Sequence, residues 1–294
     1  MKKIFAALLL VIAFSLNAQV TANRFFYELT FKPGIEIDSL KKEMTILDIT
    51  KEKSLYRDYL MVSQDSLLKV YMDQAMKSGN FSMKTFRATF KEPKFSYRVS
   101  KTYPTMDVKF TEQILQDKVS YDEKLKFDWK IENEKAKIGE YNAQKATTTY
   151  GGRNWTAWFS TDLPFQDGPY KFYGLPGLIV KLEDSEKNYS WELKGNKKID
   201  NYEEQSYGEK MQASFGSRGK ELTVSKEKFD QIYYNYKQDP YASIRPQLAQ
   251  IPADMKMPDG TSIAQMMKDE EARLKKFLAE NNNSVEKPQP KAKK

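Results

Sequence analysis

The sequence predicts a mainly β protein of the α+β class, in which a mostly antiparallel sheet is followed by a C-terminal helical segment. The sheet is predicted because apolar side chains alternate with polar or charged ones along residues 125–131 and 189–193. A repeat of two places every second side chain on one face of a strand, so each segment predicts a strand with one buried face. Strands that expose their other face to water are typical of antiparallel sheets.

Other segments rich in aromatic and β-branched residues extend this predicted sheet. We expect further strands at residues 24–31, 43–49, 81–90, 95–100, 138–148, 153–159 and 178–182. The sheet should therefore continue to about residue 196.

Helical periodicity is present in three places. Apolar residues recur at spacings of three and four over residues 67–75, which predicts a helix that ends near residue 79. A second helix is expected from Ser225, a suitable N-cap, to Asp239, which precedes a proline. A third helix should begin at Thr261 and turn four apolar side chains inward, namely Ile263, Met267, Leu274 and Leu278.

The N-terminus indicates export. Lys2 and Lys3 precede an apolar stretch at residues 4–16, which is shorter than the roughly 20 residues that a transmembrane helix needs. Small residues after it allow cleavage after Ala18 or Ala22. We therefore expect a signal peptide at residues 1–22, a domain at 23–283 with C-terminal helices from about 225, and a disordered basic tail at 284–294. The mature chain should be periplasmic or secreted and should have no transmembrane segment.

Composition excludes several chemistries. The chain has neither cysteine nor histidine, which removes thiolate nucleophiles, Ser-His and Cys-His systems, and nearly all zinc and blue-copper sites. We expect no cofactor. The formal net charge is +8, but lysine and glutamate are interleaved along most of the chain. This pattern indicates a solvated surface and predicts no binding of nucleic acid.

The most unusual stretch is residues 144–180. Gly151 and Gly152 should turn the chain, and a Pro- and Gly-rich connection ends in Pro176-Gly177, the signature of a type II turn. A rigid apolar loop that feeds a buried strand explains this stretch. The alternative is a ligand or partner surface, since Arg and Trp are enriched in binding hot spots, and its residues would be Arg153, Trp155, Trp158, Pro169, Leu175 and Pro176.

At these residues the chain resembles the GLPGLI family of Bacteroidota, whose hexapeptide is intact at residues 174–179. Other matching features are the strand at 24–29, the runs at 141–146, 152–158 and 168–172, and the short motifs at 239–241 and 281–283. Ser284 replaces the proline that usually follows the asparagines. The resemblance implies an exported protein without an assigned activity. It also implies a strongly curved antiparallel sheet or half-barrel, whose concave face would hold an apolar ligand or peptide.

Two weaker signals concern metal ions and acid–base chemistry. Four thioethers that could hold Cu(I) cluster near the third helix, but flexible packing on that helix explains them better: they are Met255, Met257, Met266 and Met267. The carboxylate pairs at residues 122–123 and 183–184 lie at strand ends, where we expect solvated turn residues.

These observations leave three functional hypotheses. The first is a non-catalytic binding or accessory protein of the bacterial cell envelope, whose partners would be outer-membrane proteins of an assembly or transport complex. The second is a periplasmic carrier of lipid or apolar peptide. The third is a hydrolase that uses two carboxylates about 5–10 Å apart in a cleft.

Overall fold

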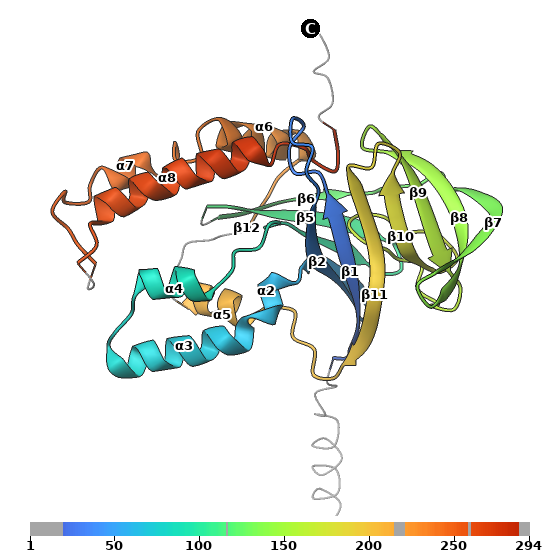
Figure 1. Ribbon diagram of the computed structural model, residues 1–294, viewed down its shortest axis with the longest axis horizontal. Helices are drawn as coiled ribbons and strands as arrows, with labels where there is room; N and C mark the ends of the chain where they lie inside the picture. The colour runs from blue at the N-terminus through green and yellow to red at the C-terminus, as the bar shows by residue number, and fades with distance from the viewer. Residues whose placement is uncertain (1–19, 116, 215–220, 258–259, 288–294) are drawn as a thin grey trace, which may run out of the picture.

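Twelve strands form one open, mainly antiparallel sheet in the computed structural model (Figure 1), which describes residues 20–115, 117–214, 221–257 and 260–287. The order is β12-β6-β5-β4-β3-β2-β1-β11-β10-β9-β8-β7, and β12 runs parallel to β6. This confirms the predicted fold class. The strands are β1 (Ala22–Phe31), β2 (Lys41–Ile49), β3 (Lys53–Asp58), β4 (Arg98–Thr102), β5 (Asp107–Ile114), β6 (Asp117–Glu123), β7 (Lys130–Ile138), β8 (Tyr141–Tyr150), β9 (Arg153–Ser160), β10 (Leu178–Asp184), β11 (Tyr189–Ile199) and β12 (Glu221–Thr223).

One face of the sheet carries the hydrophobic core. Every second side chain of β1 is buried, from Phe25 to Phe31, and Trp191 on the neighbouring strand β11 is 0% exposed. The connection between β9 and β10, residues 161–177, folds over this face, so that Phe165 contacts Phe25 with ring centroids 5.3 Å apart. The inner face is therefore filled by the protein's own aromatic rings.

The predicted strand at residues 125–131 is only partly confirmed. Leu125, Phe127 and Trp129 turn toward the core and alternate with exposed residues, but β7 begins only at Lys130. The preceding backbone follows the core instead of a neighbouring strand, and the indole of Trp129 donates to the carbonyl of Tyr173 at 2.9 Å. Ile131, predicted to be buried, is 46% exposed.

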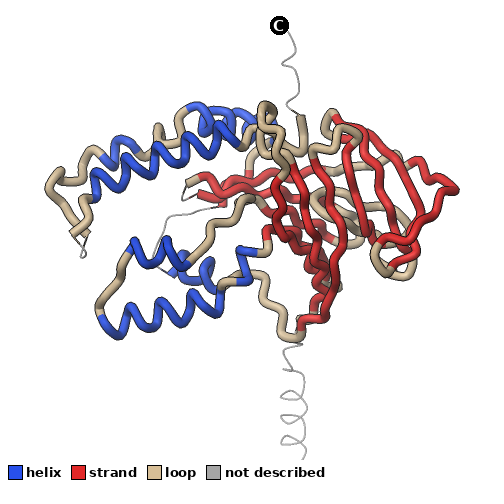
Figure 2. The backbone as a smooth tube through the Cα atoms, viewed as in Figure 1, coloured by secondary structure: helices blue, strands red, loops and turns tan. Residues whose placement is uncertain are grey.

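Helices form two arms that project from one end of the sheet (Figure 2). The lower arm consists of α2 (Leu60–Ser63), α3 (Asp65–Ser78), α4 (Met83–Thr89) and α5 (Tyr207–Ser214), and the upper arm of α6 (Lys226–Gln238), α7 (Arg245–Leu248) and α8 (Ile263–Glu280). Three predicted helices are confirmed as α3, α6 and α8. Ser225 caps α6 as expected, whereas Ser262 and not Thr261 caps α8.

The predicted strand at residues 81–90 is wrong, because this segment contains helix α4. Ser82 caps the helix by accepting a hydrogen bond from the Thr85 amide at 3.3 Å. Its phenylalanines pack on Tyr71 of α3, with ring centroids 5.8 Å apart for Phe86 and 5.6 Å for Phe90. The alternating rings therefore serve a helix–helix contact. The predicted strand at 138–148 is divided by Gly139, whose φ of 57° marks the turn between β7 and β8.

Two predicted boundaries, those of the basic tail and of the signal peptide, lie near the ends of the described chain. The expected disorder from residue 284 is wrong for the first four residues, because Val285 is 5% exposed and lies in the core. The expected signal peptide lies outside the described residues up to position 19, but Ala22 is 1% exposed and pairs with Ile199 in the sheet. Within the described part of the chain, none of the helices combines the length and the apolar character needed to cross a membrane.

Candidate functional site

The turn between β8 and β9 places Arg153 inside the protein. Gly151 and Gly152 have φ values of 59° and 73°, as the two-residue turns of tight hairpins require. Arg153 follows directly and is 4% exposed. Its guanidinium pairs with the buried carboxylate of Asp184 at 3.0 Å, so this arginine does not form part of an open surface.

The remaining donors of Arg153 bind the C-terminal segment of the same chain. Nε donates to the carbonyl of Val285 at 3.0 Å, and Nη2 donates to the carbonyl of Ser284 at 2.9 Å and to Oδ1 of Asn283 at 2.7 Å. We call residues 283–287 the latch. The Lys287 amide continues the contact by donating to the carbonyl of Gly151 at 2.8 Å.

The carboxylate of Glu286 in the latch occupies a cationic pocket. Lys171 Nζ lies 2.6 Å away, the Tyr170 hydroxyl donates at 2.7 Å, and Lys226 Nζ lies at 3.6 Å. Burial alone would raise the pKa of Glu286, but the two ammonium groups hold this pKa below its ordinary value. Lys171 also pairs with Glu123 at 2.6 Å, so this lysine lies between the two carboxylates and offsets part of their negative charge.

A second buried lysine holds the connection at residues 161–177. Lys101 Nζ lies 2.5 Å from Oδ1 of Asp167 and donates to the carbonyls of Gly168 and Tyr170 at 2.8 and 3.1 Å. Both side chains of this ion pair are almost fully buried. Such a pair is maintained only where its remaining hydrogen-bonding groups are satisfied, and here it fixes the loop on the inner face of the sheet.

The predicted type II turn at Pro176-Gly177 is wrong. Gly174 has the positive φ, 95°, while Gly177 does not. Gly177 is needed for another reason, because a Cβ there would lie 2.2 Å from the carbonyl oxygen of Ser160. The glycine therefore permits close contact between the loop and the end of β9.

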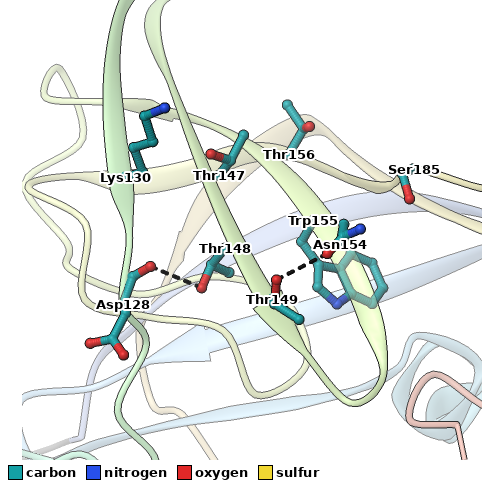
Figure 3. Close-up of a pocket in the computed structure, with 9 residues that line it drawn as sticks. All are labelled: Asp128, Lys130, Thr147, Thr148, Thr149, Asn154, Trp155, Thr156 and Ser185. Atoms are coloured by element: carbon teal, nitrogen blue, oxygen red, sulfur yellow. Dashed lines mark hydrogen bonds between the residues drawn. The ribbon is translucent and has the colours of Figure 1, made fainter.

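Five of the six residues predicted for a ligand or partner surface are buried. Arg153, Trp155 and Trp158 are 4%, 1% and 9% exposed, and Leu175 is 1% exposed. Pro169 is buried as well, and Pro176 alone among the six predicted residues is exposed. The structure does bring these residues into one region, but they build the core and the attachment of the latch. Figure 3 shows the groove nearest to them, of about 380 Å³, where threonines predominate and only Trp155 comes from the predicted set.

Sequence reasoning missed the buried charged residues. Glu123 and Asp184, expected to be solvated, are ion-paired with Lys171 and Arg153. Lys101 shares its face of β4 with the buried Val99, so its place in the alternation could have indicated burial.

Glu112 is a further buried carboxyl that the sequence did not indicate. It lies on the inner face of β5, where burial raises its pKa to about 7. Ser96 is its side-chain hydrogen-bond partner. A raised pKa is common at catalytic sites, but no second carboxylate is hydrogen-bonded to Glu112 in the described part of the chain.

The only signal for a metal ion in the sequence was the weak one from the four methionines near α8. Among residues 20–287, apart from the short undescribed gaps, no group of three or more aspartate or glutamate side chains is arranged to hold a metal ion. Met255 is 49% exposed, in the connection between α7 and α8. The Met257 amide there bonds the carbonyl of Thr261 at 2.8 Å, so the methionines lie at the far end of the upper arm.

Comparisons with known proteins find a match to one short family segment and a structural similarity at low identity. Residues 150–181 match a family described as "Protein of unknown function (Porph_ging)". This segment contains Arg153, the start of β10 and the connection at residues 161–177, which we call the inner loop. No curated protein matches the chain. Structures of PNGF-II in space groups C2 and P21 are similar at 14% identity with a TM-score of 0.49, over 74% of this chain and about a third of PNGF-II, 33% and 34% respectively.

Proposed function

We propose that this chain is an exported, non-catalytic binding protein of the bacterial cell envelope, related to the GLPGLI proteins of Bacteroidota, and that it binds an outer-membrane protein partner through its helical arms. The observation that carries the proposal is the location of exposed apolar residues. On α3, Leu67 and Val70 are 50% and 53% exposed and Met76 is 62% exposed. Such residues gathered on one helix mark interaction surfaces more often than isolated ones do.

The filled interior argues against the lipid-carrier hypothesis. A carrier needs a cavity that encloses an acyl chain, but Phe172 and Trp191 on the inner face are 0% exposed, and Trp155 contacts Phe172 with ring centroids 4.9 Å apart. The hydrolase hypothesis is weakened because Lys171 forms ion pairs with both Glu123 and Glu286.

Affinity purification from detergent-solubilised envelopes tests the proposal. A tagged chain crosslinked in cells should isolate a defined envelope protein, and the double variant Leu67→Ser/Val70→Ser should lose it. Ile131→Ser, which changes an exposed residue on the edge strand β7, is the matched control and should retain it. Recovery of the same partner with the α3 variant, or of a lone monomer in every case, would refute the proposal.

Export makes a separate prediction about the mature N-terminus. Cleavage after Ala22 would remove a buried residue from β1, whereas cleavage after Ala18 leaves β1 complete. We therefore expect mass spectrometry of periplasmic or secreted material to give a chain that starts after Ala18. Intact chain found in the cytosol would contradict export.

A further inference from the structure

We call the groups that contact the latch the cradle, namely the β8–β9 turn with Arg153, Tyr170, Lys171 and Lys226. We propose that the cradle is a peptide-binding site, and that the latch is its resident ligand and holds the upper arm to the sheet. The peptide it recognises is a short segment that bends at Val285 and Glu286. It presents an amide, a β-branched apolar residue and a carboxylate in the order of Asn283, Val285 and Glu286. This inference extends the proposed function, because the latch would position the upper arm, one of the two arms proposed to bind the partner.

The contacts of the latch are those of a recognised peptide. The carbonyls of Ser284 and Val285 accept from Arg153, and the amides of Asn283 and Lys287 donate to the carbonyls of Pro33 and Gly151. Main-chain hydrogen bonds of this kind give affinity when a protein binds a peptide. Val285 inserts its side chain into the core and is 5% exposed. Asn283 donates from Nδ2 to the carbonyl of Lys32 at 2.9 Å and to Oδ1 of Asn188 at 3.1 Å. Each of the three side chains thus meets a group of matching chemistry.

The β8–β9 turn provides the space in which the latch lies. A Cβ on Gly151 would lie 2.9 Å from Cγ of Glu286, and a Cβ on Gly152 would lie 3.2 Å from Cβ of Lys287. The two glycines therefore serve the cradle as well as the turn, because any side chain at Gly151 would collide with the bound segment.

The latch also joins the two ends of the upper arm. Glu286 lies after α8, while Lys226 is the first residue of α6, and their charged groups are 3.6 Å apart. Lys171, from the inner loop, lies 2.6 Å from the same carboxylate. One carboxylate thus connects the start of the arm, its end and the sheet, so release of the latch should free the arm at α8.

Full-length variants test whether the cradle is a peptide-binding site. Val285→Asp disfavours docking of the latch but changes no cradle residue. Asn282→Asp introduces the same charge three residues earlier at an exposed position and keeps the Oδ1 that accepts from the Ile35 amide. A fluorescent peptide with the sequence of residues 281–287 should bind the Val285→Asp chain in an anisotropy titration. It should bind neither the unchanged chain nor the control, whose cradles are occupied.

A peptide in which glutamine replaces the glutamate should bind about tenfold more weakly or worse, because charge-assisted hydrogen bonds are lost. In hydrogen-exchange experiments, α8 should exchange at least about tenfold faster in the Val285→Asp chain than in the control. Added peptide should not reverse this effect, because the peptide fills the cradle without being attached to α8.

A folded Val285→Asp chain that fails to bind the peptide would overturn the peptide-binding site, and unchanged exchange in α8 would overturn the role of the latch in holding the arm. If Val285→Asp does not fold, as judged by circular dichroism, Asn283→Ala replaces it in both measurements with the same expected direction. None of these measurements involves an envelope partner, so their failure and the failure of the proposed function are distinguishable.

Discussion

The inner loop with its flanking strands and the helical arms differ in how they use the same kinds of residues. Around the inner loop, most aromatic rings are buried, and the paired side chains of Lys101 and Asp167 are 0% and 1% exposed. On the arms, Arg87 and Glu270 are 46% and 24% exposed, and apolar side chains of α3 face solvent. The segment with the most unusual composition therefore forms the tightly packed interior. The apolar surface available to a partner lies on α3, whose sequence is less distinctive.

The ion pairs follow the same division. A buried pair costs desolvation and is maintained by complete hydrogen bonding, as the three carbonyls around Lys101 provide. The arms meet through exposed pairs, Arg87 with Glu270 at 2.9 Å and Arg273 with Glu92 at 2.6 Å. Exposed pairs contribute little stability, so contact between the arms should be easier to change than the sheet.

The largest expected effect contrasts one ring from each region. Trp155→Ala should lower the free energy of unfolding by about 3–5 kcal/mol, because a buried ring leaves a cavity. Phe86→Ala removes a half-buried ring between α3 and α4 and should cost roughly 1 kcal/mol, given partial burial. Urea denaturation of both variants measures the difference. Equal losses would show that the lower arm belongs to the same cooperative core.

The pH dependence of stability tests the buried carboxyl of Glu112. Its pKa is about 7 in the folded protein and near 4.5 ordinarily, so the folded state holds the proton more tightly than the unfolded chain. Its contribution to stability therefore falls as pH rises from 4.5 to 7, by about 3 kcal/mol in total.

Glu112→Gln should remove this loss and make the protein more stable than the parent chain at pH 8. The lowered pKa of Glu286 acts in the opposite direction, so Glu286→Gln should reduce stability at pH 8. Urea titrations at pH 5 and pH 8 distinguish the two carboxyls. A Glu112→Gln chain with the same pH dependence as the parent would contradict the assignment.

Much of the fold follows from side-chain periodicity. The strands β1, β9, β10 and β11 and the helices α3, α6 and α8 were predicted because local patterning and tertiary burial agree there. The strand prediction for residues 81–90 failed because the spacing of their aromatic rings also suits a helix. Phe86 and Phe90 pack on the neighbouring helix α3. The strands β3, β5 and β6 were missed, since buried charged residues such as Arg57 and Glu112 interrupt their apolar pattern.

The site was predictable in position but not in role. The segment around Arg153 was identified by its composition, but burial depends on partners that are distant in the sequence. The latch binds Arg153 across a separation of about 130 residues, and no local pattern encodes that contact. The helix at residues 67–75 was predicted, but periodicity defines an apolar stripe and not whether that stripe is covered, so the exposure of Leu67 and Val70 was not predicted.

A glycine substitution tests the close approach in the inner loop. Gly177→Ala should destabilise the protein by about 1–3 kcal/mol, since overpacking forces the backbone of the loop away from Ser160. Gly195→Ala is the matched control, because a Cβ there meets nothing within 4 Å, and it should be neutral or slightly stabilising. Thermal denaturation of the two variants measures this, and a stable Gly177→Ala chain would show that the loop can shift.

The smallest expected effect concerns the contact between the arms. Raising the NaCl concentration from about 0.1 to 1 M shortens the Debye length from about 10 to 3 Å and should weaken the exposed pairs of α8 by less than about 1 kcal/mol each. Hydrogen exchange in α4 and α8 should then accelerate several-fold, while β1 and β11 remain unchanged. Arg87→Gln/Arg273→Gln should reproduce the effect at low salt and reduce its further dependence on salt, since the exposed Arg245–Glu271 pair of α8 remains. If the strands and the arms responded equally, the exposed ion pairs would not be what holds the two arms together.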